Sequence, residues 1–473
     1  MIRFENFSFS YGDLINPQIR NFNFTIKPSQ CVLLCGASAC GKTTAAKCIN
    51  GLIPHFTEGN MEGAVLLNGE KISDIPSWEL SSHIGSVFQN PKTQFFNLDS
   101  SSELVFGMEN LGIPTEEMHS RVKKVAEELE IQALLNRDVF SLSGGEKQLL
   151  ALASVYAMNP DVYVLDEPTA NMDQQSIAHL MRILRKLKRD GKTIVISEHR
   201  LYFLMDLIDQ AVWIEHGAIR NIFTGDQFRA ISDEERIRMG LRCFKAPEKL
   251  PGTLKETQAG LLQVRDLSVR IGKKQVLQDI SFSADPGDII AVTGGNGSGK
   301  TTFLRTLCGL LREHSGTVTY DGRPYSFKKR RALCAMTMQD VAHQLFGDSV
   351  EAEFSLLNRD IPKEQIDSIL QTLDLQEYRD HHPMTLSGGQ KQRLAIGAAS
   401  LSGKQILTFD EPTSGLDYGN MCQVSRLIQD LAKDRIIFIA THDRELVNML
   451  CTKELSLHSH TAQLVSYGVS HRF

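Results

Sequence analysis

Two short segments of the chain place a lysine and a hydroxyl residue directly after a run of mostly small residues. Both follow the pattern GxxxxGK[ST], in which converging backbone N–H groups and the start of a helix bind phosphate. We expect Lys42 and Lys300 to reach the phosphates, and Thr43 and Thr301 to bind Mg²⁺. The first segment consists of Gly36, Ala37, Ser38, Ala39, Cys40, Gly41, Lys42, Thr43 and Thr44. The second consists of Gly294, Gly295, Asn296, Gly297, Ser298, Gly299, Lys300, Thr301 and Thr302.

A pair of adjacent carboxylates follows each phosphate-binding segment at a distance. Asp166-Glu167 and Asp410-Glu411 each end an apolar run typical of a buried strand. An aspartate in this place can hold Mg²⁺, and the glutamate after it can orient or deprotonate the attacking water. A lone Asp-Glu pair is usually only a surface feature. Its position after a buried strand and downstream of a phosphate loop favours the catalytic interpretation.

One histidine and one glutamine complete the candidate chemistry in each half. His199 and His442 follow apolar runs at matching positions, so we expect them to contact the γ-phosphate. Gln89 and Gln339 lie between the phosphate loop and the later motifs, and we assign them to Mg²⁺ and the attacking water. A single histidine in such a place would more often be structural. Its recurrence in both halves favours a catalytic role.

A serine followed by two glycines precedes a predicted helix in each half. The residues are Ser143, Gly144 and Gly145, and then Ser387, Gly388 and Gly389. A hydroxyl and exposed N–H groups at a helix start can bind a second anion. Alone, such a segment would indicate only a loop, but here it is a third motif that occurs twice in a fixed order.

The repeat of these motifs in one order divides the chain into two similar halves. Apolar runs such as Val162–Leu165 and Ile436–Ile439 are typical of buried parallel strands, and helical patterns lie between them. This alternation predicts an α/β fold with a parallel core. We expect a first domain over residues 1–235, a linker over 236–259 and a second domain over 260–473.

The composition restricts the class of protein. The chain has 473 residues, 42% of them hydrophobic, and a net charge of −5, which does not favour nucleic-acid binding. No apolar stretch is long enough to span a membrane, and the amino terminus does not resemble a signal peptide. The nine cysteines lack zinc-like spacing, so we expect reduced thiols in the cytoplasm.

Together these motifs resemble the ATP-binding-cassette (ABC) family over nearly the whole chain. The resemblance implies two tandem P-loop NTPase domains, each with a mostly parallel core sheet, an antiparallel β subdomain and a helical subdomain. It implies an ATPase in which the halves form an intramolecular pseudo-dimer and bind two MgATP. Each phosphate loop would face the Ser-Gly-Gly signature of the other half. Tyr11 matches the aromatic residue that stacks on adenine in this family. Ile271 replaces it in the second half, and Glu146 replaces the usual signature glutamine, so some asymmetry between the sites is expected.

A narrower resemblance concerns the segments after the two glutamines. Residues 89–96 and 339–346 are similar to segments of energy-coupling-factor (ECF) transporter ATPases, as is Ser197-Glu-His-Arg-Leu201. This implies a motor at the cytoplasmic side of the membrane that drives uptake of a vitamin or metal ion. Its partners would be a transmembrane coupling protein and a substrate-binding membrane protein. Phe95, Phe96, Leu345 and Phe346 would then line a docking groove, or else belong to the core. An ordinary ABC importer or exporter, or a soluble ABC protein acting on ribosomes or nucleic acid, are the alternatives.

Overall fold

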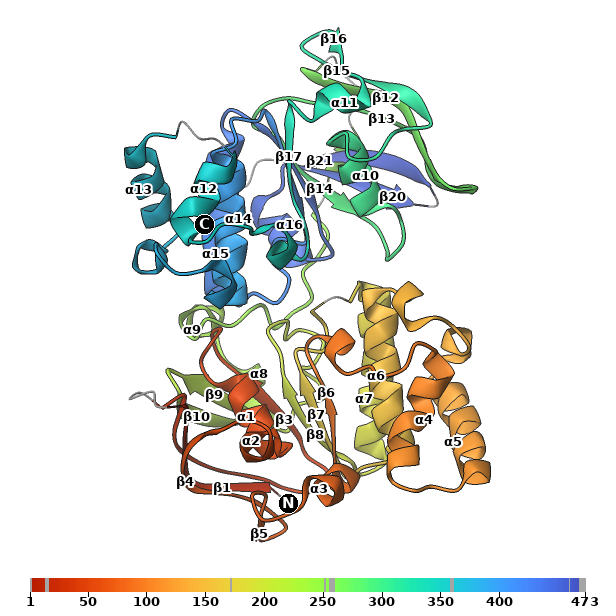
Figure 1. Cartoon of the computed structure of the whole chain (residues 1–473), viewed down its shortest axis with the longest axis vertical. Coiled ribbons are helices and arrows are strands. Elements are labelled where there is room, and N and C mark those ends of the chain that lie inside the picture. The colour runs from red at the N-terminus through yellow and green to blue at the C-terminus, as the bar shows by residue number, and fades with distance from the viewer. Residues whose placement is uncertain are drawn as a thin grey trace. The chain divides into compact units, whose positions relative to one another are not determined.

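The computed structural model describes residues 2–12, 17–170, 172–250, 252–254, 260–357, 361–458 and 460–467. The chain divides into two compact units, Met1–Ala246 and Pro247–Phe473 (Figure 1). We refer to them as unit 1 and unit 2. Each contains one phosphate loop and one copy of every motif named above, and each is described by itself.

The core of unit 1 is a six-stranded sheet in the order β10-β9-β3-β8-β7-β6. Its strands run parallel except β10, which pairs antiparallel with β9. Such a sheet is covered on both faces, which explains why its central strands are continuous apolar runs. The strands are β3 (Cys31–Cys35), β6 (Ile84–Val87), β7 (Val162–Asp166), β8 (Thr193–Ser197), β9 (Gln210–Glu215) and β10 (Ala218–Thr224).

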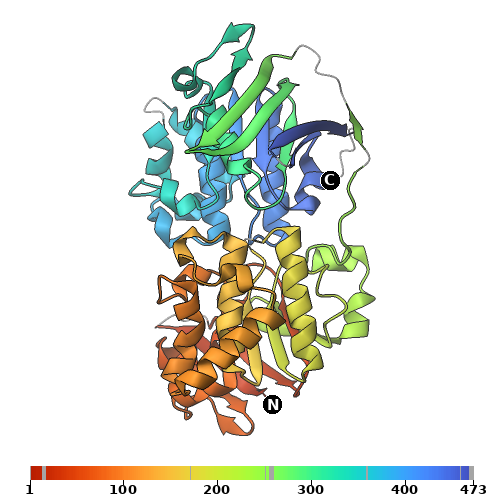
Figure 2. The ribbon, with the colours of Figure 1, turned by 90° about the vertical axis from the view of Figure 1, so that its right-hand side faces the viewer.

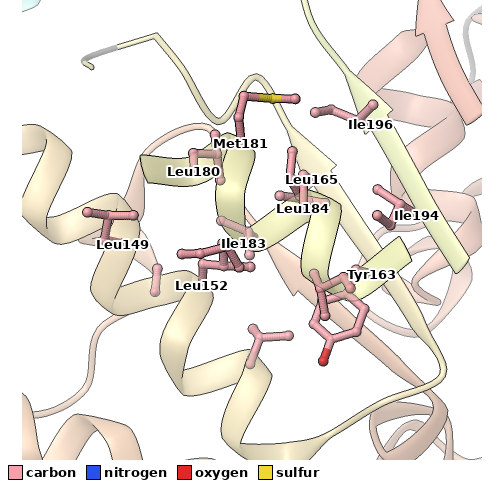
Figure 3. Packing of buried hydrophobic residues seen from close by; sticks show 14 of the residues in the cluster. Leu149, Leu152, Tyr163, Leu165, Leu180, Met181, Ile183, Leu184, Ile194 and Ile196 are labelled. Atoms are coloured by element: carbon pink, nitrogen blue, oxygen red, sulfur yellow. The ribbon is translucent and has the colours of Figure 1, made fainter. Parts of the chain in front are cut away.

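The two faces of this sheet belong to two different hydrophobic clusters, because successive strand residues point in opposite directions. Leu33 and Leu165 pack with helices α6 (Gly144–Met158) and α7 (Gln174–Arg189). Val32 and Val164 pack instead with helix α1 (Lys42–Ile49) and the antiparallel sheet. Figure 3 shows the first cluster, with Leu152, Leu165, Leu184 and Ile196 among its members. The sheet is therefore held rigidly between two layers, as a catalytic edge requires.

A second sheet and a helical subdomain complete unit 1. The antiparallel sheet has the order β2-β1-β4-β5. The helices that follow β6, coloured orange to yellow, gather in front of the strands in Figure 2. These elements are β1 (Ile2–Tyr11), β2 (Ile19–Ile26), β4 (Gly59–Leu67), β5 (Glu70–Lys71), α2 (Leu52–His55), α3 (Ser77–His83), α4 (Ser100–Asn110) and α5 (Thr115–Glu128).

Unit 2 repeats this architecture with an extended core sheet in the order β11-β21-β20-β14-β19-β18-β17. Strands β20, β14, β19, β18 and β17 are parallel, and β21 and β11 add antiparallel at one edge. Its antiparallel sheet has the order β13-β12-β15-β16. The core strands are β11 (Gly252–Leu254), β14 (Ile289–Thr293), β17 (Cys334–Thr337), β18 (Ile406–Asp410), β19 (Ile436–Ala440), β20 (Lys453–His458) and β21 (Thr461–Tyr467).

Most of the remaining elements of unit 2 follow the order of unit 1, but α16 lies between β19 and β20, where unit 1 has turns between β8 and β9. The predicted α/β class with a parallel core is confirmed in both halves. The antiparallel strands are β12 (Leu262–Ile271), β13 (Lys274–Ala284), β15 (Ser315–Tyr320) and β16 (Arg323–Pro324). The helices are α10 (Lys300–Leu307), α11 (Phe327–Arg330), α12 (Val350–Leu357), α13 (Lys363–Thr372), α14 (Gly388–Ser400), α15 (Tyr418–Ala432) and α16 (Arg444–Leu450).

The division between the units falls inside the segment that we expected to be a linker. Helices α8 (Gly225–Arg229) and α9 (Asp233–Arg238) precede it. Phe228, Met239 and Leu241 are buried in the core cluster of unit 1. Residues up to Ala246 therefore pack as part of unit 1, because these apolar side chains remove the segment from solvent. Strand β11 adds to the edge of unit 2.

The helices of the described residues include none that is both long enough and apolar enough to cross a bilayer.

Replacing Leu184 by alanine tests the packing between α7 and the core sheet. Leu184 is fully buried, so we expect Leu184→Ala to lower the free energy of unfolding of unit 1 by about 2–5 kcal/mol. The measurement is urea unfolding, with hydrogen exchange assigning the transition to unit 1. Arg185, the exposed neighbour of Leu184, offers a matched control, since Arg185→Ala should change the free energy of unfolding by less than about 0.5 kcal/mol. Equal effects of the two substitutions would contradict this packing.

Candidate functional site

The phosphate loop of unit 1 joins the end of β3 at Cys35 to the start of α1 at Lys42. Gly36 has φ 144°, and a Cβ there would approach the carbonyl oxygen of Ile214 to 2.1 Å. Gly41, with φ 112°, precedes the helix. Both glycines are therefore required by the backbone and its surroundings. In unit 2 the matching glycines have φ 147° and 100°, so the two loops share one backbone form.

The lysine of each loop folds back over the loop that precedes it. Lys42 Nζ donates to the carbonyl oxygens of Gly36 at 3.0 Å and Ala37 at 2.8 Å. Lys300 Nζ makes the equivalent contacts at 3.0 and 3.3 Å. Both ammonium groups thus lie at the start of a helix, whose N–H groups add partial positive charge. This arrangement suits a polyphosphate anion.

The two loops differ at one strained position. Ala39 has φ 61°, in the left-handed region where a side chain is unfavourable. The matching residue of unit 2 is Gly297, with φ 76°. Cys40 is buried, at 5% exposure, so it is an interior residue rather than an accessible thiol.

A threonine hydroxyl and an aspartate carboxylate meet beside each loop. Thr43 Oγ1 donates to Asp166 Oδ1 at 3.3 Å, and Thr301 Oγ1 donates to Asp410 Oδ2 at 2.7 Å. Ser197 Oγ donates to the same oxygen of Asp166. Burial raises the pKa of both aspartate carboxyls, and the hydrogen bonds from these hydroxyl groups oppose that shift.

These oxygen donors fit Mg²⁺, which prefers oxygen ligands and is commonly bound through one or two carboxylates, waters and substrate phosphates. Among the described residues, no group of three or more histidine, cysteine, aspartate or glutamate side chains is placed to hold a metal by itself. An ion held by Thr43 and Asp166 would therefore take further ligands from nucleotide phosphates and water. The same argument applies to Thr301 and Asp410.

Glu167 of unit 1 lies between the predicted glutamine and the predicted histidine. Gln89 Nε2 donates to Glu167 Oε2 at 2.7 Å, and His199 Nε2 lies 3.4 Å from Glu167 Oε1. Burial by itself would raise the pKa of Glu167, but His199, Lys42 and Gln89 together hold it below its ordinary value. The backbone of Glu167 has φ 43°, a left-handed conformation of the kind found at functional sites. This carboxylate is therefore an ionised acceptor suited to orienting a water.

The matching residues of unit 2 keep the contact between glutamate and imidazole, with His442 Nε2 3.9 Å from Glu411 Oε1, and make further bonds around it. Glu411 also has a left-handed backbone, with φ 49°. Its carboxylate accepts from Thr441 Oγ1 at 3.0 Å and from the backbone N–H of His442 at 3.0 Å. The His442 ring nitrogen Nε2 lies 2.8 Å from Lys300 Nζ and 3.0 Å from Asn296 Oδ1. Gln339 follows β17 as Gln89 follows β6, next to the strand that ends in the carboxylate pair.

Each Ser-Gly-Gly segment begins a helix, as predicted. Ser143 caps α6 in a reciprocal capping box with Glu146, and Ser387 caps α14 in the same way with Gln390. Glu146 therefore performs the capping role of the glutamine that it replaces, and Arg137 Nη1 donates to it at 2.8 Å. Burial alone would raise the pKa of Glu146, but the hydrogen bonds from Ser143 and Arg137 lower it overall.

A cavity of about 250 Å³ opens beside the predicted metal ligands of unit 1. Thr43, Asp166 and Gln89 line it together with Phe88 and Asn50. It therefore belongs to the same site and connects the phosphate loop with the segment that follows the glutamine.

Known proteins are similar to both halves of this chain. The family model described as ABC transporter matches residues 19–170 and 277–414. The chain belongs to the ABC transporter family. A Treponema denticola protein described as a putative ABC transporter ATP-binding protein is 47% identical, and the match covers 97% of this chain and 95% of that protein. A Bacillus subtilis protein described as the putative HMP/thiamine import ATP-binding protein YkoD is 32% identical, with 97% and 90% covered.

A solved structure with two such domains supports the fold alone. The archaeal ribosome recycling factor aABCE1, solved in complex with the ribosomal stalk protein aP1, has a TM-score of 0.66 and 21% identity to this chain. The likeness covers 98% of this chain and 90% of that one. With the family established, the predicted activity is confirmed: the chain is an ATPase with two ABC domains fused in one polypeptide.

The aromatic position of this ABC protein differs between the units as expected. Tyr11 is half-buried, and its hydroxyl lies 3.1 Å from Thr44 Oγ1 in the phosphate loop. Ile271, its counterpart, is 54% exposed. The tyrosine is thus fixed next to the loop, while the stacking on adenine remains a prediction.

Sequence reasoning assigned no role to two residues of this site. Ser197 bonds Asp166, and buried Glu198 bonds the histidine segment. Their counterparts in unit 2 are Ala440 and Thr441, so a comparison of the halves gave no recurring signal. The charged residues of Ser197-Glu-His-Arg-Leu201, next to a buried strand, are the signal in the sequence that points to these two residues.

The strain at Ala39 predicts opposite effects of two substitutions. Ala39→Gly should raise the free energy of unfolding of unit 1 by about 1 kcal/mol, because glycine accepts a left-handed backbone without steric cost. The matched change Gly297→Ala should destabilise unit 2 by about 1 kcal/mol, since space for the added Cβ is open and only the φ angle opposes it. Chemical denaturation of the two variants measures this. Shifts of the same sign would refute it.

Proposed function

We propose that this chain is the ATP-hydrolysing motor of an ECF-like importer that takes up a micronutrient through separate membrane subunits. The observation that carries the proposal is a pair of exposed aromatic residues at equivalent places in the two units. Phe96 and Phe346 each follow the site glutamine by seven positions. They are 75% and 77% exposed. Exposed aromatic side chains at repeated positions suit contact with a partner.

Other apolar side chains support a docking surface on each unit. Phe96 stacks on Phe106 with ring centroids 4.8 Å apart. Leu356, at the place of Phe106 in unit 2, is 59% exposed. By contrast, Leu345 is buried and Phe95 packs against the core. The prediction that Leu345 lines a docking groove is therefore wrong. Phe95 is only partly available for such a groove, because it packs against the core.

The position of these aromatics next to the glutamines suggests how hydrolysis reaches the membrane. Gln89 bonds Glu167, and Phe96 N–H donates to Glu103 Oε2 at 3.1 Å, which ties the segment to α4. A change at the nucleotide would thus move a segment that the partner contacts. The YkoD relative, named for HMP/thiamine import, supports a vitamin-type cargo for this motor as well. The partners would be a transmembrane coupling protein and a substrate-binding membrane protein, at the cytoplasmic side of the membrane.

Within the motor, each predicted residue has a role that its contacts support. Lys42 and Lys300 neutralise phosphate charge, and His199 and His442 contact the γ-phosphate. Glu167 and Glu411 orient the attacking water. Mg²⁺ would supply further charge neutralisation of the triphosphate. Each phosphate loop would be completed by Ser143 or Ser387 of the other unit, so that two MgATP hold the units together and hydrolysis releases them.

The role of Glu411 can be measured in a chain whose first site is silenced by Glu167→Gln. We expect the added change Glu411→Gln to cut the remaining ATP turnover at least 100-fold, because an amide cannot accept the proton of the attacking water. ATP affinity should stay within threefold. Phosphate release and nucleotide binding are the measurements. Turnover of the double variant equal to that of Glu167→Gln alone would disprove the role.

Capture of the tagged chain from detergent-solubilised membranes tests the assembly. We expect a small integral membrane protein to co-purify, and Phe96→Ser with Phe346→Ser to reduce its recovery at least fivefold. Trp78→Ser is the matched control, since Trp78 is 72% exposed but lies in α3, outside the segments after the glutamines. Co-purification of an ordinary two-subunit transporter core would indicate the alternative, an ordinary ABC importer or exporter. Recovery of ribosomes or DNA in place of membrane proteins would refute the proposal.

A further inference from the structure

A second buried glutamate lies next to the predicted catalytic histidine of unit 1. Glu198 is 3% exposed, and its two carboxylate oxygens accept four hydrogen bonds. Oε2 accepts from Thr169 N–H at 3.2 Å and from Thr169 Oγ1 at 2.6 Å. Oε1 accepts from the backbone N–H of His199 at 2.7 Å and of Arg200 at 3.1 Å. The donors come from the turn after Glu167 and from the histidine segment, so one carboxylate joins both.

Unit 2 satisfies the same groups in another way. Thr441 occupies the place of Glu198, and the backbone N–H of His442 donates to Glu411 itself. Asp443 Oδ2 accepts from Thr413 Oγ1 at 3.1 Å, as Glu198 does from Thr169. In unit 2 the histidine amide is thus bound by the predicted catalytic carboxylate, whereas in unit 1 a separate carboxylate binds it.

In unit 2, Glu411 accepts the His442 amide while its Oε1 also lies 3.9 Å from the His442 ring nitrogen Nε2. Glu167 of unit 1 contacts side chains. Its two oxygens face side chains, the amide of Gln89 and the imidazole of His199. A buried backbone N–H that loses its acceptor is destabilising, so such a group is rarely left unpaired. Without Glu198, the His199 amide would need a new acceptor. Unit 2 shows that the neighbouring catalytic carboxylate can reach it.

We propose that Glu198 is a positioning residue for hydrolysis in the first ATP site. By binding the His199 amide, it keeps the Glu167 carboxylate directed at Gln89 and the imidazole. This inference rests on the proposed roles of Glu167 and His199. It assigns the chain two differently connected sites: in the first, Glu198 binds the His199 amide, and in the second, Glu411 binds the His442 amide.

The test uses the full chain with Glu411→Gln, so that turnover reports the first site. We expect Glu198→Thr to lower kcat at least tenfold while the KM for ATP stays within twofold, because the loss affects the attacking water rather than nucleotide binding. Glu198→Gln, which keeps an acceptor oxygen for the His199 amide, should retain kcat within threefold. A KM that rises with kcat unchanged would overturn the proposal.

A transplanted variant separates positioning from structural support. Glu198→Thr with Arg200→Asp installs the Thr-His-Asp order of unit 2, in which the aspartate can accept from Thr169 as Asp443 does from Thr413. Arg200→Asp also removes the bond from Arg200 Nη1 to the Met172 carbonyl, so we expect a melting temperature above that of Glu198→Thr rather than equal to that of the parent chain. We expect kcat to stay at least tenfold low, since Glu167 then binds the His199 amide. Recovery of kcat together with stability would overturn the proposal and leave Glu198 a structural role.

These results remain distinct from a failure of the proposed catalytic roles. If Glu167→Gln in the Glu411→Gln chain leaves turnover intact, then the assignment of Glu167 is wrong whatever Glu198 does. If Glu167→Gln abolishes turnover but both Glu198 variants retain it, then only the positioning role is wrong. Should Glu198→Thr alone not fold, Glu198→Gln and the transplanted variant decide between these outcomes.

Discussion

The parallel direction of the core strands is the constraint on which both sites depend. In unit 1, β3, β6, β7 and β8 are adjacent and parallel, so the segments after them emerge at one edge of the sheet. Those segments carry the phosphate loop, Gln89, the Asp166-Glu167 pair and His199. Antiparallel strands would send half of these groups to the opposite edge. The apolar cores on both faces then fix the edge within a rigid sheet.

Gathering these groups at one edge brings three carboxylates together in a largely buried place, which is costly unless each is paired or hydrogen-bonded. Each of the three carboxylates of unit 1 is paired or hydrogen-bonded in a different way. Asp166 accepts from hydroxyl groups, Glu167 faces an imidazole and an amide, and Glu198 accepts two backbone N–H groups from the histidine segment. The result separates their protonation behaviour, since the pKa of Asp166 is raised and that of Glu167 is lowered.

The two halves keep this framework and differ in the contacts around it. Ala39 holds a left-handed backbone where Gly297 does so without strain, and Glu198 replaces the threonine of unit 2. The signature helices diverge too: Arg393 of α14 donates to the carbonyl of Leu373 and to Asn420, while Leu149 takes its place in α6. Fold and loop geometry tolerate these exchanges, because the two phosphate loops share one backbone form and both signature helices begin with the same capping box. This ATPase therefore has two similar sites with different contacts around them.

The sequence by itself determined the class of fold, the strands and helices next to the motifs, and the residues of the phosphate loops, because these depend on local periodicity and on φ angles that few residues accept. The helix starts at Ser143 and Ser387 belong here as well. Only the tertiary structure decided which side chains pair. It places Glu198 and Ser197 in the site and buries Leu345 in the core instead of on the docking surface. It also shows that the histidine amide binds Glu411 in unit 2 but Glu198 in unit 1. Contacts between residues far apart in the chain depend on how the layers pack, and no spacing along the sequence records that.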